Sequence, residues 1–297
     1  MLTVLRLGDA ENGRVCAGMT APAFAVTRTS VRNLSSTASD LHRFAWEPVE
    51  AALATMRSHS GEGSTAGLLN PFFAADHTGW TPAGALVSGE ALTTLLDVAA
   101  HRWSAAPHAA AALAWKSYSY WAALPIVLGW ASARRVPLLT AEQTLVRLGG
   151  GEMRFTGAAP DWAVLPDDPL AMVAPVWSDG ARVIVVPDEE SLLRVVRETL
   201  LDRHLDPLLE GIRERVRIGR RTLLGSVASG VSYGMIRAEV GLPCGTQESL
   251  ATLLTALDLD DLVEVSAEAD GLAVRRKTCC LAFTLDQPKV CSGCCIR

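Results

Sequence analysis

Residues 103–133 read WSAAPHAAAALAWKSYSYWAALPIVLGWASA, an almost uncharged stretch that is long enough to cross a bilayer. Alanine dominates it, Lys116 stands near its middle, and Pro107 and Pro125 interrupt it. Because a lysine at the centre of a bilayer is costly, a membrane span is the weaker interpretation. We expect a buried helix or a pair of helices here, and at most peripheral contact with a membrane.

The composition narrows the class of protein. A chain of 297 residues can bury a large core without disulfides. The formal net charge is −5, with acidic and basic residues mixed along the chain, which argues against non-specific nucleic-acid binding. The first twenty residues do not form a signal peptide, since Arg6 and Asp9 interrupt the apolar run. We therefore expect a cytoplasmic protein, in which clustered cysteines indicate metal or redox chemistry.

Periodicity on both sides of residues 103–133 indicates an α+β fold, mostly helical with a modest antiparallel sheet. Helical spacing of apolar residues recurs in 87–103, 188–216, 220–240 and 246–260. Strand patterns occur in 143–157, 162–166 and 181–187, and a hairpin pattern surrounds residues 269–271.

Four regions follow from this order of elements. They are a variable N-terminal region (1–84), a helical pair followed by short strands (85–188), a C-terminal helical region with a hairpin (189–274), and a cysteine-rich tail (275–297).

The tail ends in CCLAFTLDQPKVCSGCCIR (279–297), which holds five of the seven cysteines. Residues 286–289 are good turn material between two apolar runs, so a hairpin would bring Cys280 opposite residues 294–295. Cys291 and Cys294 are separated by a serine and a glycine, a spacing that allows two sulfurs to reach one metal. Thiolates gathered in this way suit zinc or an iron–sulfur cluster.

The choice between these metals depends on Cys279 and Cys280, which are adjacent. Neighbouring side chains of a strand point to opposite faces, so this pair needs a bent backbone to act together. Structural zinc sites take ligands that are two to four residues apart. The geometry therefore favours iron–sulfur only modestly, and zinc stays open.

The spacing CC-x10-C-x2-C resembles that of the FhuF-like ferric siderophore reductases. The matching residues are Cys279, Cys280, Cys291 and Cys294, preceded by Arg275 and Arg276 as is usual in that family. The aromatic, serine-containing segment 115–131 and the helical segment 220–231 are also similar to parts of the family, so the resemblance extends over residues 85–297.

The resemblance implies a [2Fe–2S] cluster held by those four cysteines, so that the C-terminal hairpin would hold the iron–sulfur cluster. It also implies one-electron reduction of a ferric siderophore in the cytoplasm, which releases Fe(II) for iron acquisition. No catalytic side chain beyond the cluster is needed. Arg275, Arg276 and Lys277 would offset the cluster's negative charge or dock a partner, or they are simply a solvated strand end. Since no G-x-G-x-x-G follows a strand, we expect an external electron donor such as a ferredoxin or a flavin/NAD(P)H reductase.

Other candidates are less specific. Trp115, Lys116 and Tyr118 are candidates for lining a siderophore pocket, although aromatic residues at helical spacing are more often core. Cys295 is a fifth thiol, either a spectator or a competitor of Cys294. Cys16 and Cys244 stand alone and indicate ordinary thiols. Two alternatives remain for the function: a zinc-stabilised, non-redox binding protein linked to siderophore metabolism, and an iron–sulfur sensor.

Overall fold

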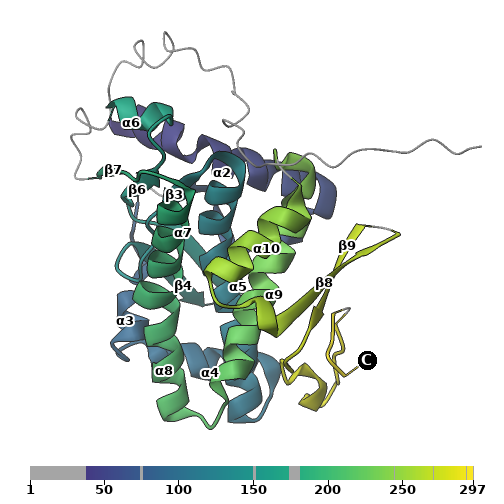
Figure 1. Cartoon of the computed structure of the whole chain (residues 1–297). Coiled ribbons are helices and arrows are strands. Elements are labelled where there is room, and N and C mark those ends of the chain that lie inside the picture. Colours follow the sequence, from purple (N-terminus) through teal and green to yellow (C-terminus); the bar gives the residue numbers. More distant parts are fainter. Residues whose placement is uncertain are drawn as a thin grey trace, which may run out of the picture.

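The computed structural model describes residues 38–73, 76–149, 152–173, 181–243, 245–269, 271–291 and 293–296. Its helices are α2 (Ala38–Ser60), α3 (Gly84–Val87), α4 (Leu92–Trp103), α5 (Pro107–Ala133), α6 (Pro169–Val173), α7 (Glu189–Arg197), α8 (Asp206–Arg215), α9 (Arg220–Ala238) and α10 (Thr246–Ala256). Its strands are β1 (Leu68–Phe73), β2 (Thr81–Pro82), β3 (Arg135–Pro137), β4 (Thr144–Gly149), β5 (Glu152–Gly157), β6 (Trp162–Val164), β7 (Val183–Val185), β8 (Val263–Glu268) and β9 (Gly271–Arg276). The expected mostly helical α+β class is confirmed (Figure 1).

Residues 107–133 of the apolar stretch form one continuous helix, α5, and not a pair. Pro107 occupies its first turn, where the missing N–H costs nothing, and Pro125 is accommodated inside it. Most of its side chains are buried, because α4, α2 and α9 surround it. Within the described parts of the chain, no helix is long and apolar enough to cross a membrane.

Helices α5 and α9 lie side by side and form the most extensive contact in the fold (Figure 1). Small residues of α9 allow this close approach. A Cβ placed on Gly230 would lie 3.3 Å from the Cα atom of Tyr120, and one on Gly234 would lie 2.9 Å from Leu124. The α5–α9 pair is therefore a rigid base for whatever packs on its sides.

The strands form three small sheets. The first has the order β1-β5-β4-β2, with β4 antiparallel to β5, as the pattern in 143–157 predicts, and β1 parallel to β5. The second has the order β3-β6-β7 and is also mixed, since β6 and β7 run parallel. The third is the predicted hairpin of β8 and β9. The two larger sheets are thus mixed, and not purely antiparallel.

One main hydrophobic core takes buried residues from Ala45 to Val274, so the expected regions share one core from α2 onward. It includes Tyr118, whose hydroxyl lies 2.7 Å from Nε2 of the fully buried His204. His204 belongs to a π-helix (Glu198–Leu205) that joins α7 to α8. Its Nδ1–H donates to the carbonyl oxygen of Leu139, 2.9 Å away, so Nε2 accepts from the tyrosine.

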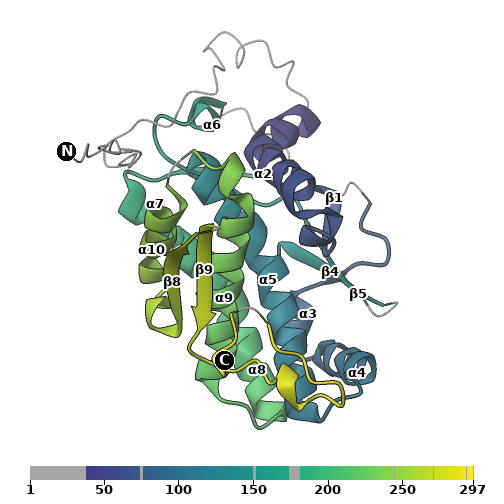
Figure 2. The same ribbon diagram turned by 90° about the vertical axis from the view of Figure 1, so that its right-hand side faces the viewer.

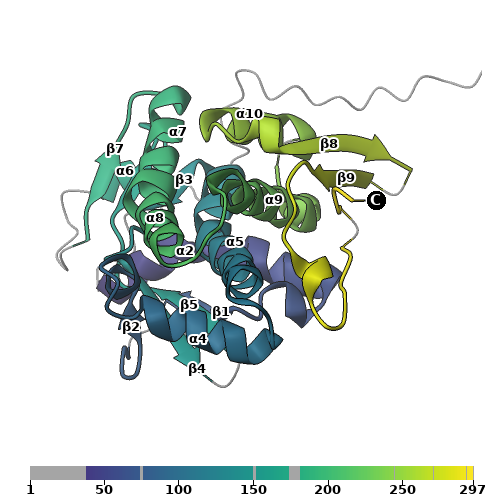
Figure 3. The ribbon, with the colours of Figure 1, turned by 90° about the horizontal axis from the view of Figure 1, so that it is seen from below.

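The tail after β9 packs beside α9 and close to α5, on the side of the molecule away from the β3-β6-β7 sheet (Figure 3). A second, smaller apolar cluster forms there, made of Leu113, Cys280, Ala282 and Leu285. The cysteine motif therefore has its own packing unit at the edge of the main core.

Candidate metal centre

Strand β9 leads directly into the cysteine tail, and the backbone ties the two together. The amide of Arg276 donates to the carbonyl oxygen of Gly293, 2.9 Å away, and the amide of Lys277 donates to that of Leu262 at 2.9 Å. The first of these bonds places the Cys-x-x-Cys segment beside the end of β9, where the tail crosses the face of the molecule seen in Figure 2. The end of β9 therefore positions both the adjacent cysteine pair, which follows it in the chain, and the Cys-x-x-Cys segment, which is bonded to it through Gly293.

The tail folds back on itself, as the turn at 286–289 predicts, but without the strand pairing of a β-hairpin among its described residues. A short 3-10 helix (Ala282–Thr284) follows the first cysteine pair, and the amide of Lys289 donates to the carbonyl oxygen of Ala282 at 3.0 Å. Among the described residues after 276, none lies in a strand. Leu281 adopts a positive φ of 62°, so the backbone turns immediately after the adjacent cysteine pair.

Two glycines allow the tail to lie directly on the body of the protein. A Cβ on Gly225 of α9 would lie 1.9 Å from Oγ1 of Thr278, the residue before the first cysteine. A Cβ on Gly293 would lie 2.0 Å from the carbonyl oxygen of Val274 and 2.6 Å from the hydroxyl of Tyr233. Neither position can carry a side chain without moving the tail, so both halves of the motif depend on glycine.

The middle of the tail is held by side chains. Cys280 packs with Leu113 of α5 in the small apolar cluster, and Trp103 at the end of α4 covers it. The ammonium of Lys289 lies 5.0 Å from the centre of the Trp103 ring, within the range of a cation–π contact. The tail is thus attached to α4, α5, α9 and β9.

The four motif cysteines and Cys295 all carry free thiols. Cys280 and Cys294 are buried, whereas Cys279, Cys291 and Cys295 are half-buried. The amide of Cys294 donates to the carbonyl oxygen of Cys291 at 3.2 Å, the tight turn expected of a Cys-x-x-Cys knuckle. The isolated Cys16 and Cys244 lie outside the described residues.

The electrostatics of two thiols show which groups are near them. Burial raises the pKa of Cys291; Lys116 and Arg276 oppose this rise, while Cys280 and Cys294 add to it. Burial likewise raises the pKa of Cys295, and the neighbouring Cys279 and Cys294 add to that rise. Both halves of the motif therefore lie within electrostatic reach of one another, and the fifth thiol lies beside Cys279.

The sulfur positions are not those of a closed ligand cage. Across the described parts of the chain, no group of three or more Cys, His, Asp or Glu side chains is arranged to hold a metal ion. A cysteine side chain turns about a single χ1 bond, so its sulfur can move without the backbone. The donor set itself, thiols with cations close by, suits a metal that prefers thiolate ligands.

The three basic residues before the motif differ in their surroundings. Arg275 and Lys277 are exposed, whereas Arg276 is 1% exposed. Nη2 of Arg276 donates to Oγ of Ser226 at 2.9 Å, and its Nε and Nη1 have no hydrogen-bond partner within the part of the chain that is described. The alternation of β9 places Arg276 on the same face as the buried Val274 and Arg275 on the opposite face, a signal that could have separated them in the sequence.

The three candidates on α5, Trp115, Lys116 and Tyr118, point to different surroundings because they follow one another around the helix. Trp115 and Tyr118 are fully buried; the indole N–H of Trp115 donates to the carbonyl oxygen of Leu223 at 2.8 Å, and Tyr118 contacts His204. This placement favours the core interpretation for both. Lys116 is half-buried and faces the tail closely enough to act on Cys291. Of the three, only Lys116 is near the cysteines.

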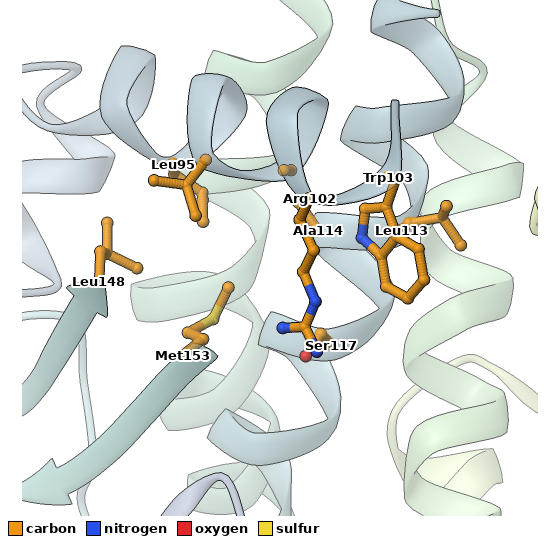
Figure 4. Close-up of a pocket in the computed structure, with 10 residues that line it drawn as sticks. Leu95, Arg102, Trp103, Leu113, Ala114, Ser117, Leu148 and Met153 are labelled. Atoms are coloured by element: carbon orange, nitrogen blue, oxygen red, sulfur yellow. The ribbon is translucent and has the colours of Figure 1, made fainter. Parts of the chain in front are cut away.

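A small pocket of about 70 Å³ lies next to this region, between α4, α5 and the β4–β5 hairpin (Figure 4). Apolar side chains of Leu95, Leu148 and Met153 line one side, and Arg102 reaches across it towards Ser117. Trp103 lines the pocket and also covers the tail cluster. Leu113 likewise lines the pocket and belongs to that cluster, so the pocket adjoins the cysteine tail through two shared side chains.

Comparison with known proteins does not assign the chain to a family. No protein-family model matches the chain, and no curated protein matches it either.

Proposed function

We propose that this protein is a cytoplasmic ferric siderophore reductase whose tail binds a [2Fe–2S] cluster through Cys279, Cys280, Cys291 and Cys294. The observation that carries the proposal is the way the tail packs. Two glycine contacts, at Gly225 and Gly293, and one strand-end hydrogen bond bring both halves of the CC-x10-C-x2-C motif to one place.

The chain's own residues supply a setting for negative charge. An oxidised [2Fe–2S] unit with four thiolates carries a net charge of −2. The cations Lys116 and Arg276 lie near Cys291 from two different elements, α5 and β9, and would offset part of that charge. Burial of Cys280 and Cys294 limits the access of water to their sulfurs. These features suit a thiolate-bound metal better than free thiols.

When bound, a two-iron cluster supplies one-electron transfer, which is all that release of the iron requires. Siderophores hold Fe(III) through hard oxygen donors and hold Fe(II) far less well. One electron added to the ferric complex therefore releases Fe(II) and leaves every bond of the organic ligand intact. The role of the protein is to hold the electron carrier near its surface and to position the substrate.

An external protein would supply the electron. The exposed cations Arg275, Lys277 and Lys289 surround the motif, together with the exposed apolar side chains of Phe283 and Val290. This mixture suits a partner with an acidic surface, such as a ferredoxin; a flavin reductase is the other class of donor.

The test is an absorption spectrum of anaerobically purified protein, with iron, sulfide and zinc measured on the same sample. We expect a red-brown protein with about two irons and two sulfides per chain. Dithionite should bleach it, and a ferric hydroxamate should restore the colour while Fe(II) appears in a ferrous chelator. A colourless protein with one zinc per chain would refute the proposal in favour of a zinc-stabilised protein. A coloured protein that does not reduce the hydroxamate would indicate a sensor.

A further inference from the structure

The side chain of Arg276 lacks the partners that a buried guanidinium requires. An arginine stays charged in a protein, and all five of its N–H groups are donors. Arg276 is 1% exposed, yet only Nη2 has an acceptor, the neutral hydroxyl of Ser226. Nε and Nη1 are buried without a partner among the described residues, and no described ion pair includes Arg276. A buried charge of this kind is strongly unfavourable unless an anion accompanies it.

A second arginine of the same chain shows the usual arrangement. Arg135 is also buried, at 5% exposed, and it forms a two-bond ion pair with Asp168, Nε to Oδ2 at 3.1 Å and Nη2 to Oδ1 at 3.0 Å. Its Nη1 donates to the carbonyl oxygen of Phe44 at 2.8 Å. The fold thus satisfies a buried guanidinium completely where no site is nearby. The missing partners of Arg276 set it apart.

The position of Arg276 indicates what the missing anion is. Its own amide donates to the carbonyl oxygen of Gly293, 2.9 Å away, in the segment between Cys291 and Cys294. The nearest groups that become anions on metal binding are therefore the motif thiols. A tetrahedral zinc with four thiolates carries the same net charge of −2 as the oxidised two-iron cluster.

We propose that Arg276 is the counter-charge of the metal-bound motif, with Nε and Nη1 donating hydrogen bonds to its sulfur atoms. The inference deepens the proposed function and rests on it for the identity of the metal. Such donors stabilise the bound form, and they favour the reduced, more negative state of a cluster, so they raise its reduction potential.

The test compares the metal-free and metal-bound forms of Arg276→Met, Arg276→Lys and wild type. Met fills a similar volume without charge. In the metal-free protein Arg276→Met should be as stable to urea as wild type or more stable, because an unpaired buried charge is removed. In the bound protein it should weaken metal retention about 10- to 100-fold and shift the midpoint potential downward. Arg276→Lys, which keeps the charge but loses the paired donors, should give intermediate values.

Ser226→Ala is the matched control, because it removes the one observed partner of the guanidinium and leaves the charge in place. It should leave retention and potential close to wild type. Equal loss of stability in both forms of Arg276→Met would show a purely structural role and overturn the inference, as would unchanged retention.

Failure of the proposed function would give a different result. If wild type takes up zinc in place of iron, the reductase proposal fails, but the charge argument still predicts faster zinc loss from Arg276→Met than from Ser226→Ala. A wild-type tail that binds neither metal would overturn both.

Discussion

Replacing Gly225 by alanine should empty the metal centre without unfolding the protein. The added Cβ would lie 1.9 Å from Oγ1 and 2.8 Å from Cβ of Thr278, whereas such contacts are essentially never shorter than 3.0 Å. Thr278 must therefore retreat by about 1 Å, and the adjacent Cys279 must move with it. Overpacking of this kind typically costs about 1–3 kcal/mol where the neighbour is held in place, as it would be in the metal-bound tail.

The effect on α9 itself has the opposite sign. Alanine in a helix interior is more favourable than glycine by about 0.8–1.0 kcal/mol. Since the small tail cluster can move aside, we expect metal-free Gly225→Ala to melt at the same temperature as wild type or slightly higher, while iron per chain falls to a small fraction. Iron and sulfide analysis and thermal unfolding on the same preparation would measure both quantities.

Two further variants test whether the contact with Thr278 causes the loss of iron. Adding Thr278→Ala to Gly225→Ala removes the contacts with Oγ1 at 1.9 Å and Cγ2 at 2.8 Å and leaves only that with Cβ at 2.8 Å, so most of the iron should return. Gly211→Ala is the matched control inside α8, where the added Cβ meets only the end of the Leu92 side chain at 3.3 Å. Normal loading of Gly225→Ala, or failure of the second change to restore iron, would refute this account of the tail.

Three further outcomes are expected. Changing any one motif cysteine to serine should bleach the protein and Cys295→Ser should not; a colourless Cys295→Ser protein beside a coloured Cys294→Ser one would contradict the ligand assignment. His204 is fully buried and its pKa falls from 6.5 to about 4, chiefly by desolvation. As the pH falls from 6.5 to 4, the unfolded chain binds a proton at His204 that the native state does not bind, so the free energy of unfolding decreases by about 3 kcal/mol in all. In urea denaturation, the unfolding free energy of His204→Gln should therefore depend less on pH over this range. Lys277→Glu should slow reduction by a plant-type ferredoxin at low salt but not reduction by dithionite, and equal slowing of both would exclude docking at this segment.

The periodic parts of the chain could be predicted from sequence because their signals are local. The apolar run that became α5, the strand pair at 143–157 and the β8–β9 hairpin each follow from spacing alone. The mixed pairing of the two larger sheets was not predicted, since parallel pairs such as β6 and β7 join segments that are distant in sequence.

The candidate site could be predicted only in part, for a related reason. The spacing of the cysteines pointed to the tail, and the glycine of the knuckle to a tight turn. The chain folds back between Ala282 and Lys289, as the turn at 286–289 predicts, but none of the described residues after 276 lies in a strand. The alternation of β9 puts Arg276 on the face of the buried Val274, whereas the role of Gly225 depends on how the tail lies against α9, a contact between segments that no local pattern encodes.

The separate apolar cluster under the tail has a consequence for the life of the protein. Cys280 and its neighbours pack outside the main core, and single backbone bonds from Arg276, Lys277 and Lys289 hold much of the segment. Units with so few contacts open at a lower free energy than the whole fold, and amide exchange in the tail should be faster than in α5 or α9. If the tail binds a metal as proposed, its loss would be a reversible local event, and the folded protein could be reloaded without new synthesis.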